Sequence, residues 1–119
     1  MTQELRLTLN RDPEAPAQAR RAVDVFDGSF AEEVRLLVSE LVTNSVLHGG
    51  TGSEERIGLV LRDTGDEVRC EVTDAGSWRE PNPDPRGLSG WGLQLVDRIS
   101  DRWGVIRRDG TTVWFEIEH

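Results

Sequence analysis

Hydrophobic positions along the chain follow two periods, one typical of strands and one typical of helices. Leu5, Leu7 and Leu9 alternate with polar residues, which indicates a strand with one buried face. Ser29 and Glu32 form a capping box before a longer apolar segment, which indicates a helix that begins there. The pattern predicts, in chain order, a strand over 5–9, helices over 17–26 and 32–48, strands over 57–62 and 68–72, a helix over 92–102, and strands over 103–107 and 111–118. This order, with its antiparallel hairpins, predicts an α+β fold in which helices and sheet form a two-layer sandwich.

A polar stripe runs along the second predicted helix. Glu40, Asn44 and His48 are spaced by four residues and therefore share one helical face, which leucines flank on both sides. A carboxylate, an amide and an imidazole each cost free energy when they are buried without partners. We therefore expect this face to border a wet cleft that holds a ligand. For His48, packing or capping of the helix end is the preferred interpretation.

The composition limits the classes of chemistry and partner. At 119 residues the chain is interpreted as one domain over 1–119, and its net charge of −8 disfavours nucleic acid and anionic membranes as partners. All 14 basic residues are arginine, which excludes Schiff-base chemistry through lysine and the lysine of a P-loop. The single cysteine, Cys70, excludes an internal disulfide. With no apolar segment long enough to span a membrane and no signal sequence, these features favour a soluble, cytoplasmic protein.

Two further segments combine glycine with chemistry-bearing positions. Asp74 and Gly76 follow a predicted strand, where a carboxylate can accept from an amino group on a ring and glycine allows close approach; an ordinary turn has the same pattern. Gly90 and Gly92 precede the third predicted helix, whose free N–H groups suit a phosphate, although a flexible turn explains this segment equally well. Neither the Walker nor the Rossmann spacing is present.

The order of these three pieces resembles the Bergerat-fold (GHKL) superfamily of ATP-binding proteins, which includes gyrase, the large heat-shock chaperone, histidine kinases and mismatch-repair ATPases. Residues 40–48 resemble its N box, residues 74–76 its first glycine box, and residues 90–95 its second. Within the superfamily, residues 39–44 and 101–105 are most similar to the serine-kinase anti-sigma factors and their actinobacterial relatives. The resemblance implies a mixed, mostly antiparallel sheet covered on one face by helices.

The resemblance also implies roles for individual residues. Glu40 would be the catalytic general base on an attacking hydroxyl, Asn44 would bind the Mg²⁺ that bridges the phosphates of ATP, and Asp74 would accept from the adenine amine. The further nucleotide contacts that it implies are Gly76 beneath the ring, Gly90, Gly92 and Leu93 of the second glycine box at the phosphates, and Thr112 to adenine through water. A hard oxygen ligand for Mg²⁺ and a carboxylate one helical turn away fit phosphoryl transfer.

The chain departs from the family pattern at two places. Ser77 and Trp78 stand where the first glycine box usually continues to a second glycine, so the wall of the adenine pocket is expected to differ. The segment over 78–89 is short and rich in proline for an ATP lid, and its two basic residues, Arg79 and Arg86, are interpreted as solvated.

The leading hypothesis, by resemblance, is an ATP-dependent protein serine/threonine kinase that regulates transcription by partner switching. It would bind a sigma factor in one state and phosphorylate a small antagonist of the STAS type in the other. This hypothesis is compatible with a homodimer. The first alternative is a non-catalytic ATP-binding adapter, which would not need a base at Glu40. The detached catalytic domain of a histidine kinase, a gyrase-like ATPase and an α+β domain without nucleotide are further alternatives.

Overall fold

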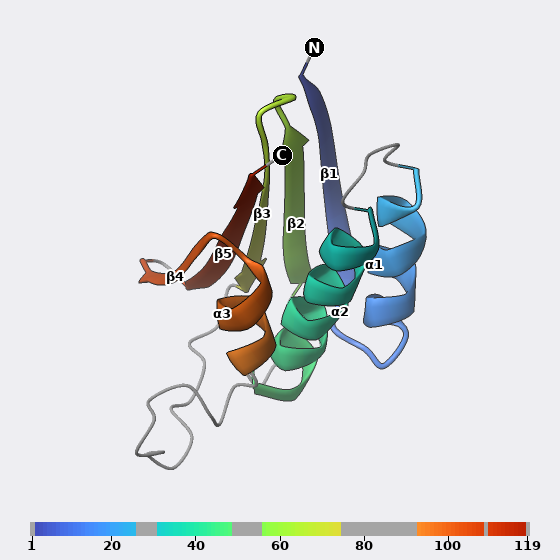
Figure 1. Cartoon of the computed structure of the whole chain (residues 1–119). Helices are drawn as coiled ribbons and strands as arrows, with labels where there is room; N and C mark the ends of the chain where they lie inside the picture. The colour runs from blue at the N-terminus through green and yellow to red at the C-terminus, as the bar shows by residue number, and fades with distance from the viewer. Residues whose placement is uncertain (1, 26–30, 49–55, 75–92, 109, 119) are drawn as a thin grey trace.

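The structure is a two-layer α+β sandwich, with one sheet and a layer of helices on one face of that sheet (Figure 1). It is a computed structural model that describes residues 2–25, 31–48, 56–74, 93–108 and 110–118. The strands are β1 (Gln3–Asn10), β2 (Arg56–Asp63), β3 (Glu67–Asp74), β4 (Arg102–Arg107) and β5 (Thr111–Glu118), and the helices are α1 (Ala15–Val23), α2 (Ala31–His48) and α3 (Gln94–Ile99). The predicted fold class is confirmed.

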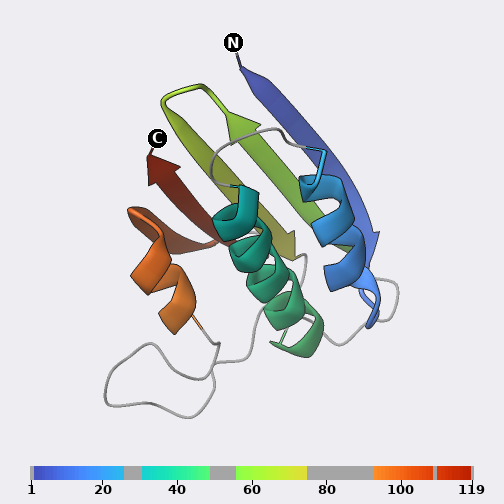
Figure 2. The ribbon, with the colours of Figure 1, turned by 45° about the vertical axis from the view of Figure 1, so that its right-hand side comes forward.

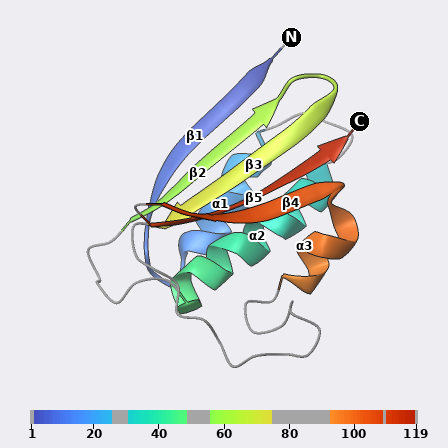
Figure 3. The same cartoon turned by 90° about the vertical axis from the view of Figure 1, so that its left-hand side faces the viewer.

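The five strands lie in the order β1-β2-β3-β5-β4, and every pairing between described strands is antiparallel. Figure 3 shows the sheet from the side, with the helices beneath one face and the other face uncovered by any described element. Because β3 pairs with β5, the strand ends that meet at one edge of the sheet come from segments far apart in the sequence. This arrangement places the end of β3 beside the start of β5.

Alternation along each strand separates an apolar face from a polar face. The residues of β3 and β5 that point toward the helices are buried, whereas their neighbours on the other face are exposed or half-buried. The largest fully buried side chains of the core are Phe115, Leu37, Leu41, Ile57, Leu59, Leu61, Val23, Val38, Val42, Val72, Val96 and Val113. Cys70 also lies in this core, where burial raises the pKa of its thiol.

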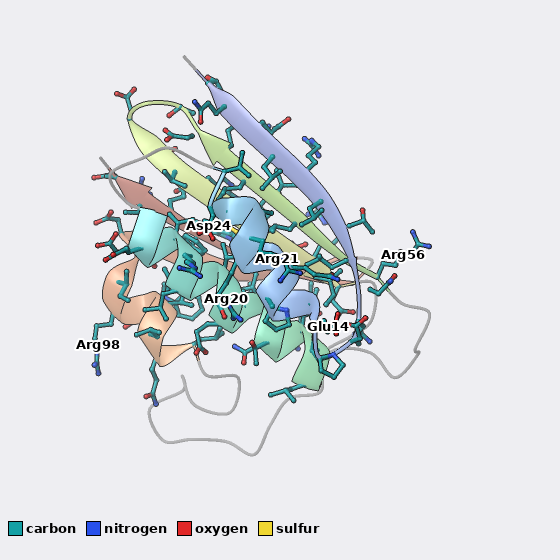
Figure 4. All side chains as sticks on the ribbon, turned by 90° about the vertical axis from the view of Figure 1, so that its right-hand side faces the viewer. Glu14, Arg20, Arg21, Asp24, Arg56 and Arg98 are labelled. Atoms are coloured by element: carbon teal, nitrogen blue, oxygen red, sulfur yellow. The ribbon has the colours of Figure 1, made fainter. Side chains whose placement is uncertain are left out.

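Helices α1 and α2 lie side by side over the sheet (Figure 2). One polar contact between them is a hydrogen bond of 2.7 Å that Nη1 of Arg20 donates to Oγ of Ser39. Figure 4 shows Arg20, Arg21 and Asp24 on the side of α1 that faces away from the sheet. No helix of the described residues is both long enough and apolar enough to cross a membrane.

The prediction for the third helix was wrong at its C-terminal end. The sequence predicted a helix over 92–102, whereas α3 covers Gln94–Ile99 and Arg102 is already the first residue of β4. Ser100 adopts an extended backbone, with φ −79° and ψ 155°, and its hydroxyl donates to the carbonyl of Val96 at 2.6 Å. The extended backbone of Ser100 ends the helix, and the chain then enters β4, where Arg102 pairs with Glu116 of β5.

The first helix begins earlier than predicted. The sequence predicted a helix over 17–26, whereas α1 covers Ala15–Val23, so it also ends earlier, and Asp24 and Val25 form a turn. Pro16 lies in the first turn of α1, where the missing N–H of proline is tolerated. Oδ1 of Asp12 accepts from the backbone N–H of Glu14 at 2.9 Å just before the helix. The other predicted helix and strands are confirmed to within two residues at each end. The residues of the capping box and of the glycine pair expected to end α2, Ser29, Gly49 and Gly50, lie outside the described residues, as does residue 26.

Candidate functional site

A group of buried polar side chains lies where the end of α2 meets the end of β3. Asp74 is the last residue of β3 and is fully buried, and Ser45 in the C-terminal half of α2 is also fully buried. Oγ of Ser45 donates a hydrogen bond of 2.5 Å to Oδ2 of Asp74. Asp74 occupies the inward phase of β3, which directs its carboxylate toward the helical layer. The hydrogen bond therefore connects the helix to the end of the strand.

A buried ion pair joins Asp74 to Arg11. Arg11 directly follows the last residue of β1, and its side chain is only 7% exposed. Its Nη2 contacts Oδ2 of Asp74, the same oxygen that accepts from Ser45. A buried carboxylate requires a partner of this kind because its ionised form is otherwise poorly solvated.

Thr111 lies beside Asp74 on the face of the sheet that the helices cover, whereas Thr112 lies on the opposite face. Thr111 is buried, begins β5 and pairs directly with Asp74 across the ladder. Thr112, which the sequence analysis assigned to adenine, lies on the opposite face, where its hydroxyl is 2.9 Å from that of Thr73. Adjacent residues of a strand point to opposite faces, so Thr112 is separated by the sheet from the carboxylate of Asp74.

Asn44 and Glu40 occupy the preceding turns of α2. Asn44 is 5% exposed, and its Nδ2 atom is buried without a hydrogen-bond partner among the described residues. Glu40, one helical turn earlier, is half-buried. His48 is the last residue of α2, and its side chain lies outside the description. The predicted helical spacing of Glu40 and Asn44 is confirmed, whereas their functional roles stay predictions.

Asn44 offers a single amide oxygen, which is compatible with Mg²⁺ held mainly by phosphates and water. The described residues contain no group of three or more histidine, cysteine, aspartate or glutamate side chains arranged to hold a metal ion. Mg²⁺ commonly binds through one or two protein oxygens together with substrate phosphates and water. The buried amide of Asn44 offers one such oxygen, whereas its Nδ2, a donor that does not bind a cation, has no hydrogen-bond partner among the described residues.

The glycine-box residues divide into those described and those not described. Leu93 is buried in the core, where it immediately precedes α3. Gly76, Gly90 and Gly92 lie outside the described residues, so their assignment to a nucleotide stays a prediction.

Sequence analysis missed Arg11, Ser45 and Thr111, and two of them carry a signal in the pattern. Leu5, Leu7 and Leu9 point inward, and Arg11 is the next position in this alternation. The pattern therefore predicts that the side chain of Arg11 is buried, as the structure has it. Ser45 lies four residues after Leu41 on the buried face of α2, which makes it a polar residue on an apolar stripe.

Comparison with known proteins gives the family. A model of the histidine kinase-like ATPase domain matches residues 9–117, which include α1–α3, β2–β4, all of β5 except its last residue, and the end of β1. No curated protein matches the chain. The match covers nearly the whole sandwich, including Asp74, Ser45 and Asn44, and a domain of this description implies ATP as a ligand. The chain therefore belongs to the family of histidine kinase-like ATPase domains.

Proposed function

We propose that this domain is an ATP-dependent protein serine/threonine kinase of the anti-sigma factor type, which acts in the cytoplasm and regulates transcription by partner switching. The observation that carries the proposal is the continuity of polar groups along α2 into β3. Glu40 and Asn44 are one helical turn apart, and Ser45 next to Asn44 bonds to the buried carboxylate of Asp74. The candidate base and the candidate metal ligand are therefore on α2, and Ser45 connects this helix to the candidate purine acceptor at the end of β3.

Each group has a role in this proposal. Asp74 accepts from the exocyclic amine of adenine, and Asn44 supplies an oxygen to Mg²⁺, which when bound neutralises charge on the phosphates. Glu40 takes the proton from a serine or threonine hydroxyl of the protein substrate as its oxygen bonds to the γ-phosphorus. The bond from the γ-phosphorus to the β–γ bridging oxygen breaks, and ADP leaves with that electron pair.

The proposed partners follow from the resemblance of residues 39–44 and 101–105 to anti-sigma factors. In one state the domain binds a sigma factor, and in the other it phosphorylates a small antagonist of the STAS type. The net charge of −8 supports protein partners over nucleic acid because the phosphate backbone repels an acidic surface.

The test compares the parent protein with Glu40→Gln. Each is incubated with Mg-ATP and a panel of STAS-type domains from the same genome, and the phosphorylated form is resolved by mass. ATP binding should stay within about threefold, whereas phosphate transfer should fall by about 10²–10⁴, the usual contribution of a positioned general base. The matched control is Glu33→Gln, which changes an exposed carboxylate in the first turn of the same helix and should transfer phosphate like the parent.

Two outcomes contradict the proposal. Equal transfer by the parent and by Glu40→Gln would remove Glu40 from the mechanism. Binding of ATP without transfer to any domain of the panel would favour the adapter, in which nucleotide acts only as a conformational ligand.

A further inference from the structure

The buried carboxylate of Asp74 is contacted from two other elements of the fold. Ser45 on α2 donates to its Oδ2 atom at 2.5 Å, and Nη2 of Arg11, from the turn after β1, forms an ion pair with the same oxygen. Asp74 and Ser45 are fully buried, and the side chain of Arg11 is 7% exposed. A helix, a turn and a strand end thus meet at one carboxylate in the interior of the domain.

These two contacts determine how the carboxylate is oriented. The last side-chain torsion of aspartate has broad minima, so its rotamer alone does not fix the plane of the carboxylate. Two groups that approach Oδ2 from different elements restrict that plane to one orientation. An ionised carboxylate has two oxygens and about four acceptor positions, so these contacts do not by themselves exhaust its capacity to accept a further donor.

We propose that Arg11 is a positioning residue of the purine site, which through its ion pair stabilises the charged carboxylate of Asp74 and holds it in the orientation that accepts from the exocyclic amine of adenine. This inference rests on the proposed ATP-binding function. An ionised carboxylate only accepts hydrogen bonds, whereas a protonated carboxyl also presents an O–H donor, which would oppose the amine. A fully buried carboxylate needs an opposite charge beside it to stay ionised, and Arg11 supplies that charge.

The backbone around Arg11 is held by hydrogen bonds on both sides. The N–H of Asp12 donates to the carbonyl of Asn10 at 2.9 Å, and the N–H of Ala15 donates to the carbonyl of Asp12 at 3.0 Å where α1 begins. The inward phase of β1 continues to Arg11 and directs its side chain toward the end of β3. The guanidinium is therefore already in place before a nucleotide binds, so the orientation of Asp74 requires no ordering during binding.

The first measurement uses the parent protein. Calorimetry in the presence of Mg²⁺ measures its affinity for ATP and for purine riboside triphosphate, which lacks the exocyclic amine. The parent should prefer ATP by about 10- to 100-fold, the range expected of one hydrogen bond to a charged group. Equal affinities for the two nucleotides would overturn the inference, because the amine would then gain nothing from Asp74.

The second measurement removes the guanidinium. The affinity of Arg11→Gln for ATP should fall by about 10- to 100-fold, whereas its affinity for purine riboside triphosphate should change by less than about threefold. Arg11→Lys retains a positive charge and should bind ATP more tightly than Arg11→Gln does. A merely structural role of Arg11 would weaken the binding of both nucleotides alike. An equal loss for the two nucleotides would therefore overturn the inference, and a loss in Arg11→Lys as large as that in Arg11→Gln would overturn the role given to the charge.

The Asp74→Asn background tests whether Arg11 acts through Asp74. It also decides the question if Arg11→Gln alone does not fold, because the double variant contains no buried carboxylate without its charged partner. In this background Arg11→Gln should leave the affinity for ATP within about threefold of that of Asp74→Asn alone, since the two substitutions remove the same interaction. A further loss of about tenfold or more would show that Arg11 acts on the nucleotide independently of Asp74 and would overturn the inference.

The matched control is Arg56→Gln. Arg56 pairs with Asn10 across β1 and β2, close in the fold to Arg11, but its side chain is exposed, and Figure 4 shows it pointing away from the end of β2. This variant loses the same charge and should bind both nucleotides like the parent. An equal loss of the preference for ATP in Arg56→Gln would assign the effect to net charge and overturn the role of Arg11.

The remaining outcomes separate this inference from the proposed function. If the parent prefers ATP and Arg11→Gln keeps that preference, the role of Arg11 is overturned while ATP binding stands. If neither protein binds either nucleotide, the proposed function is overturned, and the role of Arg11 with it.

Discussion

Ser45 and Asp74 show how single polar residues are accommodated in the interior of this domain. Both are fully buried, and the hydroxyl of Ser45 gives the carboxylate of Asp74 one of its hydrogen bonds. A hydrogen bond to an ionised group contributes more to stability than one between neutral groups. Ser45 therefore stabilises the position of the carboxylate on which purine recognition is proposed to depend.

Ser45→Ala should lower the free energy of unfolding by about 1.5–3 kcal/mol, because it removes a donor from a buried carboxylate. Urea denaturation followed by tryptophan fluorescence measures the loss. The matched control on the same helix is Ser39→Ala, where the hydroxyl accepts from Arg20 at a partly buried position. That substitution should cost less than about 1 kcal/mol, because the site is more solvated and alanine is the better helix former. Equal losses in the two variants would show that the hydrogen bond from Ser45 to Asp74 contributes no more to stability than the hydrogen bond between Arg20 and Ser39.

The sequence predicts part of the candidate site. The helical spacing of Glu40 and Asn44 and the position of Asp74 at a strand end follow from local patterns, and the structure has them there. The contact of Arg11 with Asp74 depends on how distant segments pair in space, which no local pattern contains. The faces on which Thr111 and Thr112 lie depend on strand phase, because a shift of one residue moves a side chain to the other face.

At the scale of elements, strands were predicted more closely than short helices. Alternation along β5 predicted its bounds, because one face of that strand is buried over its whole length. The prediction placed the end of the third helix too late because Ser100 and Arg102 carry no strong helix-breaking signal. Arg102 belongs to β4 because it pairs with β5, a tertiary contact that the local sequence does not contain.

The segment of residues 101–105 that resembles anti-sigma factors has structural contacts in this fold. Oδ2 of Asp101 accepts from the backbone N–H of Glu118 at 2.7 Å. Nε1 of Trp103 donates to Asp97 of α3 at 2.8 Å. These bonds connect β4 to α3 and the residue before β4 to β5, so this segment stabilises the edge of the sheet whatever partner the domain binds.

Gly104 belongs to the same segment and lies directly against the indole of Trp114 on β5. A Cβ atom at Gly104 would lie 2.8 Å from Nε1 of Trp114, whose ring is also held by the guanidinium of Arg69 at 4.4 Å from the centroid. Gly104→Ala should therefore lower the free energy of unfolding by about 1–3 kcal/mol, the usual cost of overpacking. Urea denaturation provides the measurement.

Gly58 on β2 provides the matched control for Gly104. A Cβ atom at Gly58 would meet Thr73 at 3.9 Å, an ordinary van der Waals contact. Gly58→Ala should be neutral or stabilise by up to about 1 kcal/mol, because it restricts the unfolded chain. A loss at Gly58 as large as that at Gly104 would show that glycine is needed in these strands for a reason other than the indole.

At the scale of the whole molecule, the face of the sheet away from the helices is held by ion pairs between strands. Arg62 on β2 donates to Glu4 on β1, and this hydrogen bond holds the pKa of Glu4 below its usual value. Toward the opposite edge of the same face, Arg102 on β4 donates to Glu116 on β5 at 2.8 Å, and Arg69 on β3 donates to the same carboxylate at 3.1 Å. Charged groups thus connect neighbouring strands across much of this face.

These ion pairs predict that the domain loses stability in acid. The hydrogen bond from Arg102 holds the pKa of Glu116 below its usual 4.5, with Arg69 as a further cause. A carboxyl whose pKa is lower in the folded state stabilises fully above its unfolded pKa, and this contribution is lost as the pH falls through the folded pKa. Glu116→Gln should therefore be about 1 kcal/mol less stable than the parent at pH 7, and the difference should shrink as the pH falls below about 4.5.

Urea denaturation from pH 7 to pH 3 tests this, with Asp66→Asn in the exposed turn between β2 and β3 as a control that should follow the parent at every pH. A difference between the parent and Glu116→Gln that stays constant down to pH 3 would show that the charge of Glu116 does not stabilise the fold.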